Sequence, residues 1–506
     1  KAAFARGWRS PFSEIYLRND GARAVYFRAG ADCPPTVAQA AAKLFDASQG
    51  GVLPEERFGE LDHFLAPAAK SGLASAVAAL LREGTKTRPS QEIARLVDGA
   101  GASLNASAGD DFTSVSGTFM KTHAAMGLAL LADIVRNPVF AEEEIERYVE
   151  QHLSGLAVQY NDPEYVLPLA AARMILGGHP YAYPADGTPR SVEGLRRADF
   201  VAFHRRCYAP ARAWLAIAGD VDPEEAFAAA EKEFGSWKAE ARRPRAPKPP
   251  PAPKAQVLLI DQPGAVQSQI AVGRLGVPRN HPDYLALQVA NQIFGGSFNS
   301  RLNMKLRANE GLTYGAGSSF RGQRLAGTFL VSTFTRTEKT AEAVQFIVDL
   351  IREWRENPAA EGELAEAKAF MTGSYVVDLE TAGSVAARVL TQAVFGLPED
   401  YYTRYRERIQ ALTRAEIAAA VQRHTGPAEL TVAVAGCAVF ALAGGFSGLM
   451  AARVLMGVGV AACLMAPLTG YRRWFDAGLQ LRANSWMLMT GSLGMLASTL
   501  PVQWLL

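Results

Sequence analysis

Residues 197–219 read RADFVAFHRRCYAPARAWLAIAG, and residues 414–436 read RAEIAAAVQRHTGPAELTVAVAG. When the two segments are aligned without gaps, at an offset of 217 residues, nine of 23 positions are identical. Each segment predicts an amphipathic helix, a turn at Pro210 or Pro427, and then a buried strand that ends in glycine. Nine identities in register favour a duplicated domain. The alternative is two unrelated units of helix, turn and strand that are both rich in alanine.

A proline-rich segment separates the two copies. Residues 242–254 read RRPRAPKPPPAPK, a composition typical of an extended, semi-rigid linker. The first half of the protein is therefore expected over residues 72–241 and the second half over residues 255–437. Because strand patterns and long helical patterns mix within each half, we predict an α+β fold with two homologous α/β-sandwich halves.

Hydrophobic periodicity places the main elements of each half. We predict helices at residues 75–82, 122–135, 142–159, 340–355 and 363–379, and strands at residues 257–261, 269–272 and 327–334. Residues 1–71 give a much weaker pattern, in which only residues 13–27 read as a strand or a hairpin. This N-terminal segment is left without an assigned role.

The composition excludes several classes of protein. The chain has 506 residues, of which 49% are hydrophobic and 20% charged, so it is neither disordered nor of low complexity. Its four cysteines form no C-x-x-C pair, which argues against a disulfide scaffold and against a cysteine-based zinc site. Residues 1–437 have a net charge of −1. A surface this close to neutral offers no general attraction to nucleic acid.

Residues 438–506 differ from the rest of the chain, since their only charged residues are four arginines and one aspartate. Residues 454–471 and 484–506 are uncharged runs of 18 and 23 residues, the lengths expected of transmembrane helices. The arginine-rich loop between them would face the cytoplasm by the positive-inside rule. We therefore predict an apolar helical tail that attaches the protein to a membrane. The alternative is a buried hairpin of a soluble domain.

Residues 72–85 read GLASAVAALLREGT. This stretch resembles the signature of the pitrilysin/insulinase family of zinc peptidases, the inverted zincins, whose active members read roughly G-L-A-H-x-x-E-H-x-x-x-x-G-T. The framing residues that match at the right spacing are Gly72, Leu73, Ala74, Gly84 and Thr85. The resemblance extends over about residues 72–436 and implies the two-half architecture of mitochondrial processing peptidase.

The resemblance also indicates which groups this chain lacks. In active members two histidines, four residues apart on one helix, bind zinc, and the glutamate between them activates the zinc-bound water. Ser75 and Ala79 occupy the histidine positions and Ala78 the glutamate position, and Gly155 stands at the position of the last zinc ligand. Alanine and glycine carry no side-chain donor atoms, and serine is a poor zinc ligand. We therefore predict no catalytic residue, no metal and no cofactor in this chain, and zinc only in a partner.

No other pattern in the sequence replaces this zinc site. No two of the seven histidines lie three to five residues apart, so each is interpreted as a surface residue or a hydrogen-bonded structural residue. Asp110 and Asp111 stand where the family has a strand that lines its chamber. They are interpreted as a solvated turn.

The family suggests a role for a chain without zinc ligands. Many members work as two subunits, one of which binds zinc while the other closes the chamber and helps to hold the peptide. The second kind commonly keeps an arginine and a tyrosine seven residues apart, and Arg307 and Tyr314 match that pair. A guanidinium and a phenol can both donate hydrogen bonds to a peptide carbonyl. The resemblance thus implies a non-catalytic, peptide-binding subunit with a zinc-bearing partner. In the other interpretation, Arg307 and Tyr314 are structural.

The tail has a resemblance of its own. Residues 440–506, with YRRWF at residues 471–475, resemble the fourth and fifth transmembrane segments of a major facilitator superfamily transporter. Two alternatives to the subunit hypothesis remain: a transporter fragment fused to a peptidase-like passenger, and a scaffold subunit of a processing complex. The expected location is the bacterial periplasm or cell envelope, with the chain attached to the membrane through its tail.

Overall fold

The computed structural model describes residues 12–19, 22–29, 56–60, 70–239, 246–261, 265–426 and 429–436. Contacts divide the chain into two compact units, residues 1–441 and residues 442–506, and all of the described residues belong to the first. No helix in the described ranges is long and apolar enough to cross a membrane. The predicted tail at residues 438–506 lies outside the described residues, so its membrane spans, its transporter resemblance and the envelope location stay predictions.

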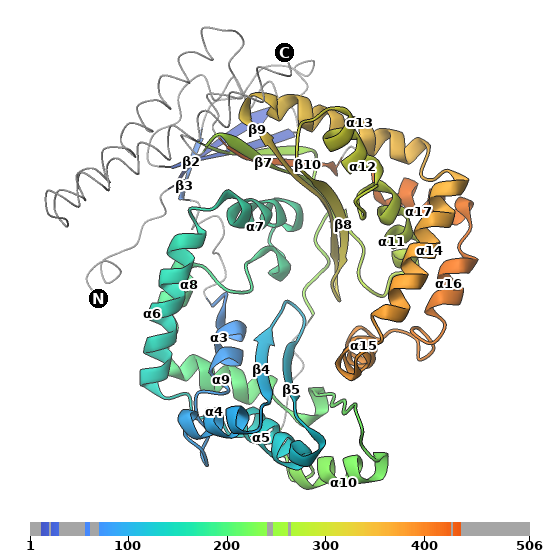
Figure 1. Ribbon diagram of the computed structural model, residues 1–506. Coiled ribbons are helices and arrows are strands. Elements are labelled where there is room, and N and C mark those ends of the chain that lie inside the picture. The colour runs from blue at the N-terminus through green and yellow to red at the C-terminus, as the bar shows by residue number, and fades with distance from the viewer. Residues whose placement is uncertain are drawn as a thin grey trace, which may run out of the picture. The chain divides into compact units, whose positions relative to one another are not determined.

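An eight-stranded sheet is the largest single element of the described structure (Figure 1). Its strand order is β3-β1-β2-β6-β10-β7-β9-β8. The strands are β1 (Phe12–Asn19), β2 (Ala22–Ala29), β3 (Glu56–Glu60), β6 (Gln256–Asp261), β7 (Gln267–Gly276), β8 (Ala316–Gly322), β9 (Gly327–Arg336) and β10 (Thr431–Gly436). The hairpin predicted for residues 13–27 is confirmed. It extends the sheet of the second half, because β2 pairs in parallel with β6. The three predicted strands of the second half are confirmed as β6, β7 and β9.

Helices make up most of the remaining structure. In the first half they are α3 (Leu73–Leu80), α4 (Ser90–Gly99), α5 (Ala124–Arg136), α6 (Glu142–Gln159), α7 (Pro163–Leu176), α8 (Pro189–Glu193), α9 (Arg197–Cys207) and α10 (Pro223–Phe234), beside a two-stranded sheet of β4 (Ser103–Ala108) and β5 (Thr113–Thr118). In the second half they are α11 (Tyr284–Phe294), α12 (Arg301–Asn303), α13 (Thr340–Glu356), α14 (Glu361–Val377), α15 (Ala382–Phe395), α16 (Tyr405–Ala411) and α17 (Arg414–His424). All five predicted helices are confirmed, with ends that differ by two residues or fewer.

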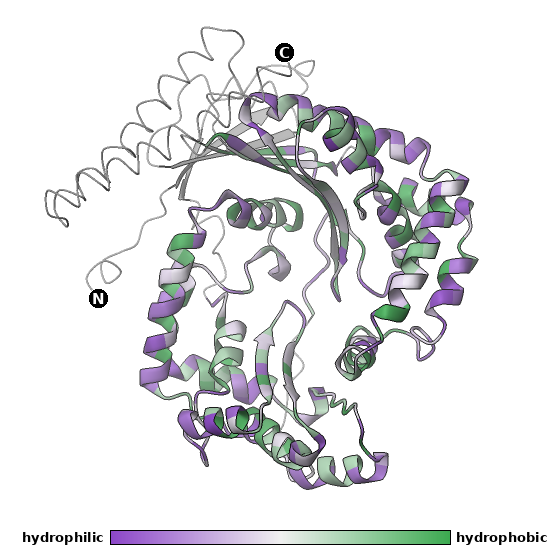
Figure 2. Ribbon diagram, in the orientation of Figure 1, coloured by the Kyte–Doolittle hydropathy of each residue, from purple (hydrophilic) through white to green (hydrophobic). Residues whose placement is uncertain are grey.

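Helices cover both faces of the sheet at β10, and the sequence of this strand is suited to that position. This strand lies between β6 and β7, and all six of its residues are buried. Val432 and Val434 pack into one core with α11, α13 and α17, whereas Ala433 and Ala435 pack into a second core against α7. A strand that is apolar at every position is expected where helices cover both faces of a sheet. The covering helices mix hydrophilic and hydrophobic residues, as amphipathic helices should (Figure 2).

The buried strand predicted before Gly219, at the end of the first half, is wrong. The helix α9 and the turn at Pro210 are present, but residues 213–218 form no strand, and Trp214 and Ile217 are 53% and 40% exposed. In the second half, the matching strand β10 has a neighbour on each side. No described strand pairs with residues 213–218. A strand can be buried only where neighbouring strands satisfy its backbone hydrogen bonds. An apolar sequence alone does not provide such neighbours.

Asp110 and Asp111 do not form the solvated turn that we expected. They lie between β4 and β5 and contact the turn between β8 and β9 in the second half. Arg321 and Gln323 donate hydrogen bonds to Oδ2 of Asp110, at 2.9 and 2.6 Å. The backbone N–H of Arg324 donates to Asp111 at 3.0 Å. The two carboxylates therefore bridge the two halves of the protein.

Asp111→Ala is expected to lower the free energy of unfolding by about 1–3 kcal/mol, because it leaves the hydroxyl of the buried Tyr181 without its acceptor. Asp111 accepts a hydrogen bond from the hydroxyl of Tyr181, a residue that is only 9% exposed, as well as from the N–H of Arg324. Asp98→Ala, which removes an exposed aspartate of α4, is the matched control. Chemical denaturation compares the three proteins. Equal stability of the two variants would contradict the bridging role of Asp111.

Candidate functional site

The helix α3 carries three of the four positions at which active relatives bind or use zinc. It begins after Gly72, whose φ of 89° favours glycine. A Cβ atom on Gly72 would lie only 2.8 Å from the carbonyl oxygen of Asp186, so the loop at residues 184–188 lies directly against the start of the helix. Val77 and Leu80 belong to the core of the first half and fix the orientation of α3.

This loop provides hydrogen-bond acceptors for the polar groups near the lost zinc ligands. The Ser75 hydroxyl donates to the carbonyl oxygen of Ala185 at 2.9 Å. His152, one turn before Gly155 on α6, approaches the carbonyl oxygen of Asp186 to 2.7 Å through Nε2. Because α3 and α6 pack against each other, the two side chains reach consecutive carbonyl groups of the same loop.

These residues do not fit a zinc ion. Ala78 is fully buried and Ala79 is partly buried, and neither side chain has a donor atom. Gly155 is exposed, and nothing lies within 4 Å of the position that a Cβ atom would take there. The hydroxyl of Ser75 and the imidazole of His152 are already engaged with backbone carbonyls. A catalytic zinc ion needs three protein ligands, and this set cannot supply them.

Aromatic packing surrounds the same loop. Burial, together with the charge of Asp186, raises the pKa of Tyr148 and of Tyr165 to about 12. Both phenols therefore stay protonated at neutral pH. The ring of His152 stacks on Tyr148 with the centroids 5.3 Å apart. Stacking and hydrogen bonds thus organise the part of the chain in which active relatives hold their metal.

Arg307 lies in a π-helical turn, Met304–Asn309 (η5), which follows α12 directly. Such turns are rare and often occur at functional sites. Three leucines within and beside the turn are buried: Leu302, Leu306 and Leu312 are at most 5% exposed. They anchor the segment in the core of the second half and leave the side chain of Arg307 on the surface.

Asn303 fixes the path of the chain on both sides of Arg307. Its side chain donates to the carbonyl oxygen of Phe298 at 2.7 Å and accepts from the N–H of Ala316 at 3.1 Å. The rings of Phe298 and Tyr314 protrude, 68% and 83% exposed. The guanidinium of Arg307 lies 4.4 Å from the ring centroid of Phe298. Within the described part of the chain, neither this guanidinium nor the Tyr314 hydroxyl makes a hydrogen bond.

Comparison with known proteins decides the family. Residues 63–183 match the profile of insulinase, peptidase family M16. Residues 194–371 match the profile described as the peptidase M16 inactive domain. The chain belongs to peptidase family M16. The family resemblance inferred from residues 72–85 is thereby confirmed.

Relatives of this M16 chain differ in how they are described. An uncharacterized zinc protease of Mycobacterium tuberculosis is 28% identical over 368 residues, which are 71% of this chain and 82% of the relative. The non-peptidase homolog YmxG of Helicobacter pylori is 22% identical over 367 residues, 72% and 84% of the two chains. The crystal structure of a peptidase M16 inactive domain from Pseudomonas fluorescens has a TM-score of 0.69 at 24% identity and covers 84% of this chain and 98% of its own. The two-domain M16 α/β fold is confirmed, and this member is a non-catalytic, peptidase-like protein.

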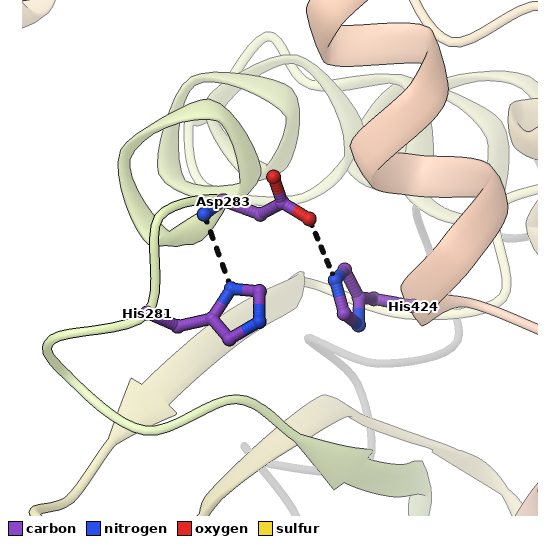
Figure 3. Close-up of side chains that lie close together, drawn as sticks. All are labelled: His281, Asp283 and His424. Carbon is purple, nitrogen blue, oxygen red and sulfur yellow. Dashed lines mark hydrogen bonds and ion pairs between the residues drawn. The ribbon is translucent and has the colours of Figure 1, made fainter.

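The M16 chain also brings together three side chains that sequence spacing did not connect. His281 and Asp283 precede α11, and His424 is the last residue of α17 (Figure 3). One donor atom from each residue lies within 4.8 Å of the others, a geometry found for no other group of three such residues in the described ranges. His281 and His424 are 143 residues apart in sequence, so no local motif could have revealed the cluster.

Proposed function

We propose that this chain is the non-catalytic subunit of a heteromeric zinc metallopeptidase, in which it binds peptide and completes the chamber of a zinc-bearing M16 partner. A contrast within the chain carries the proposal. The four zinc positions have lost the atoms that bind metal or accept a proton. The segment that presents Arg307 and Tyr314, by comparison, is anchored in the core and leaves both donors exposed.

The chemistry of these donors suits a supporting role in peptide hydrolysis. A guanidinium offers five N–H donors in a planar fork, and a phenol offers one O–H donor. Such donors bind a peptide carbonyl, and they bind it more strongly when negative charge develops on its oxygen. The ring of Phe298, 4.4 Å from the guanidinium of Arg307, restrains this side chain before peptide arrives. This chain would then contribute binding and orientation, and the partner would contribute the metal.

The proposal is tested by measuring peptide cleavage in three samples. These are the full chain, a zinc-bearing M16 protein such as one encoded in a neighbouring reading frame, and a mixture of the two. We expect the full chain alone to cleave no peptide, with or without added zinc. We expect the mixture to cleave faster than the zinc-bearing protein alone, and the full chain to bind a fluorescent peptide.

Two outcomes would contradict the proposal. Zinc-dependent cleavage by this chain alone would show that the positions on α3 and α6 are not the relevant ones. A partner that becomes more stable in the mixture, with an unchanged KM for peptide, would support the scaffold alternative instead.

A further inference from the structure

His281, Asp283 and His424 lie where two helices of the second half meet. His281 and Asp283 belong to the segment between β7 and α11, and His424 ends α17, which packs against α11. All three side chains are partly buried, and their donor atoms lie within 4.8 Å of one another. Ligands around a tetrahedral zinc ion lie about 3.3 Å apart, given bonds of about 2.0 Å. A modest movement of side chains would therefore place three donors around one ion.

The three side chains already hold one another in place. His424 Nε2 and Asp283 Oδ2 are 2.9 Å apart, and the backbone N–H of Asp283 donates to Nδ1 of His281 at 3.1 Å. The two imidazole rings stand at 85° with their centroids 5.1 Å apart. Figure 3 shows the other ring nitrogen of His281 on the side that faces His424. Two imidazoles and one carboxylate thus converge from two separate elements.

We propose that His281, Asp283 and His424 bind one divalent transition-metal ion, with zinc as its representative. Two imidazole nitrogens and one carboxylate oxygen suit zinc, nickel or copper better than magnesium or calcium, which prefer oxygen ligands. Three protein ligands leave a fourth position for water. This site is separate from the emptied one on α3, and the inference does not rest on the proposed function.

Arg423 competes with a cation for Asp283. Its guanidinium donates to both carboxylate oxygens, at 3.0 and 2.9 Å. A carboxylate has about four lone-pair positions, so Oδ2 can keep Arg423 while a metal bond replaces its contact with His424. The positive charge of Arg423 still repels the ion. The side chain of Arg423 is 56% exposed, and its removal should therefore strengthen metal binding without disturbing the core.

The histidines also set a limit on affinity. Both must be neutral to bind a metal. His281 would bind through Nε2 and carry its proton on Nδ1, so it would lose the hydrogen bond from the N–H of Asp283. Together with the charge of Arg423, this loss predicts weaker binding than at a dedicated structural zinc site.

Zinc titration of the full, tag-free chain by isothermal calorimetry tests the site. We expect one zinc ion per chain. His281→Ala should lower the affinity at least about 100-fold, because even outer-shell partners of a metal contribute about 10- to 100-fold. Arg423→Gln should bind zinc more tightly than the natural chain. His123→Ala, which removes a histidine of the first half, is the matched control and should bind zinc like the natural chain.

A gain of affinity in an Arg423→Gln variant that folds like the natural chain keeps the test decisive if His281→Ala folds poorly. Circular dichroism checks the fold of each variant. The inference is overturned if neither the natural chain nor Arg423→Gln binds zinc stoichiometrically. It is also overturned if a folded His281→Ala variant binds zinc as well as the natural chain does.

Discussion

Ala78→Glu, which restores the glutamate of active relatives, is expected to destabilise this chain by about 4–7 kcal/mol at neutral pH. Ala78 is fully buried on α3. A buried carboxyl group has a pKa raised by several units, and each unit corresponds to about 1.4 kcal/mol. The longer side chain adds a cost of about 1–3 kcal/mol from overpacking. We therefore expect that this position does not accept the catalytic group without a loss of stability.

The pH dependence of Ala78→Glu separates these two costs. A raised pKa means that the folded state binds the proton of the new carboxyl group more tightly than the unfolded state does. The electrostatic cost should therefore grow as the pH rises and vanish as the pH falls to about 4.3, the ordinary pKa of glutamate. The overpacking cost should remain at every pH. Urea denaturation at several pH values measures both contributions.

Ala79→Glu is the matched control, because it places the same side chain one residue further along the same helix. Ala79 is only partly buried, so its carboxylate can reach water, and we expect a loss of less than about 1 kcal/mol. Similar stability of the two variants would mean that Ala78 faces a polar space. In that case the catalytic position would be vacant but still usable.

Local patterns predicted the helices and the strands of the second half well. The helix α6 begins with three glutamates, at Glu142, Glu143 and Glu144, which suit the positive end of the helix dipole, and its predicted bounds are those observed. The apolar strand β10 was predicted correctly because its sequence suits a position covered on both faces. Where the hydrophobic pattern of a segment matches the burial of that segment in the fold, the sequence alone is sufficient to predict its secondary structure.

The errors arose where a structure depends on partners far away in sequence. Among the described strands, none pairs with the apolar run that includes Trp214 and Ile217, and its own residues could not reveal this. Asp110 accepts a hydrogen bond from Arg321, 211 residues away. The local sequence around Asp110 looks the same whether its carboxylate bonds a distant arginine or faces water. The cluster of His281 and His424 was missed for the same reason, because only the packing of α11 on α17 brings the two rings together.

In the heteromeric peptidase proposed above, Arg307→Ala is expected to lower kcat/KM by about 10- to 100-fold while this chain stays bound to the zinc-bearing subunit. Donors dedicated to an oxyanion contribute about 100- to 1000-fold in other enzymes, and an exposed arginine, partly solvated, should contribute less. Arg307→Lys keeps the charge but loses the planar fork, so it should recover only part of the rate. Arg352→Ala, which removes a 57% exposed arginine from α13, is the matched control and should have no effect.

Phe298 offers a graded test of the same role, because its ring lies 4.4 Å from the guanidinium of Arg307. A cation–π contact at an exposed site contributes about 0.5–1 kcal/mol, so Phe298→Leu should lower kcat/KM by about two- to fivefold. In the Arg307→Ala background the same change should have almost no further effect, since the cation is already absent. If Arg307→Ala leaves kcat/KM unchanged in an intact assembly, measured by size-exclusion chromatography, then Arg307 is structural and the peptide is held elsewhere.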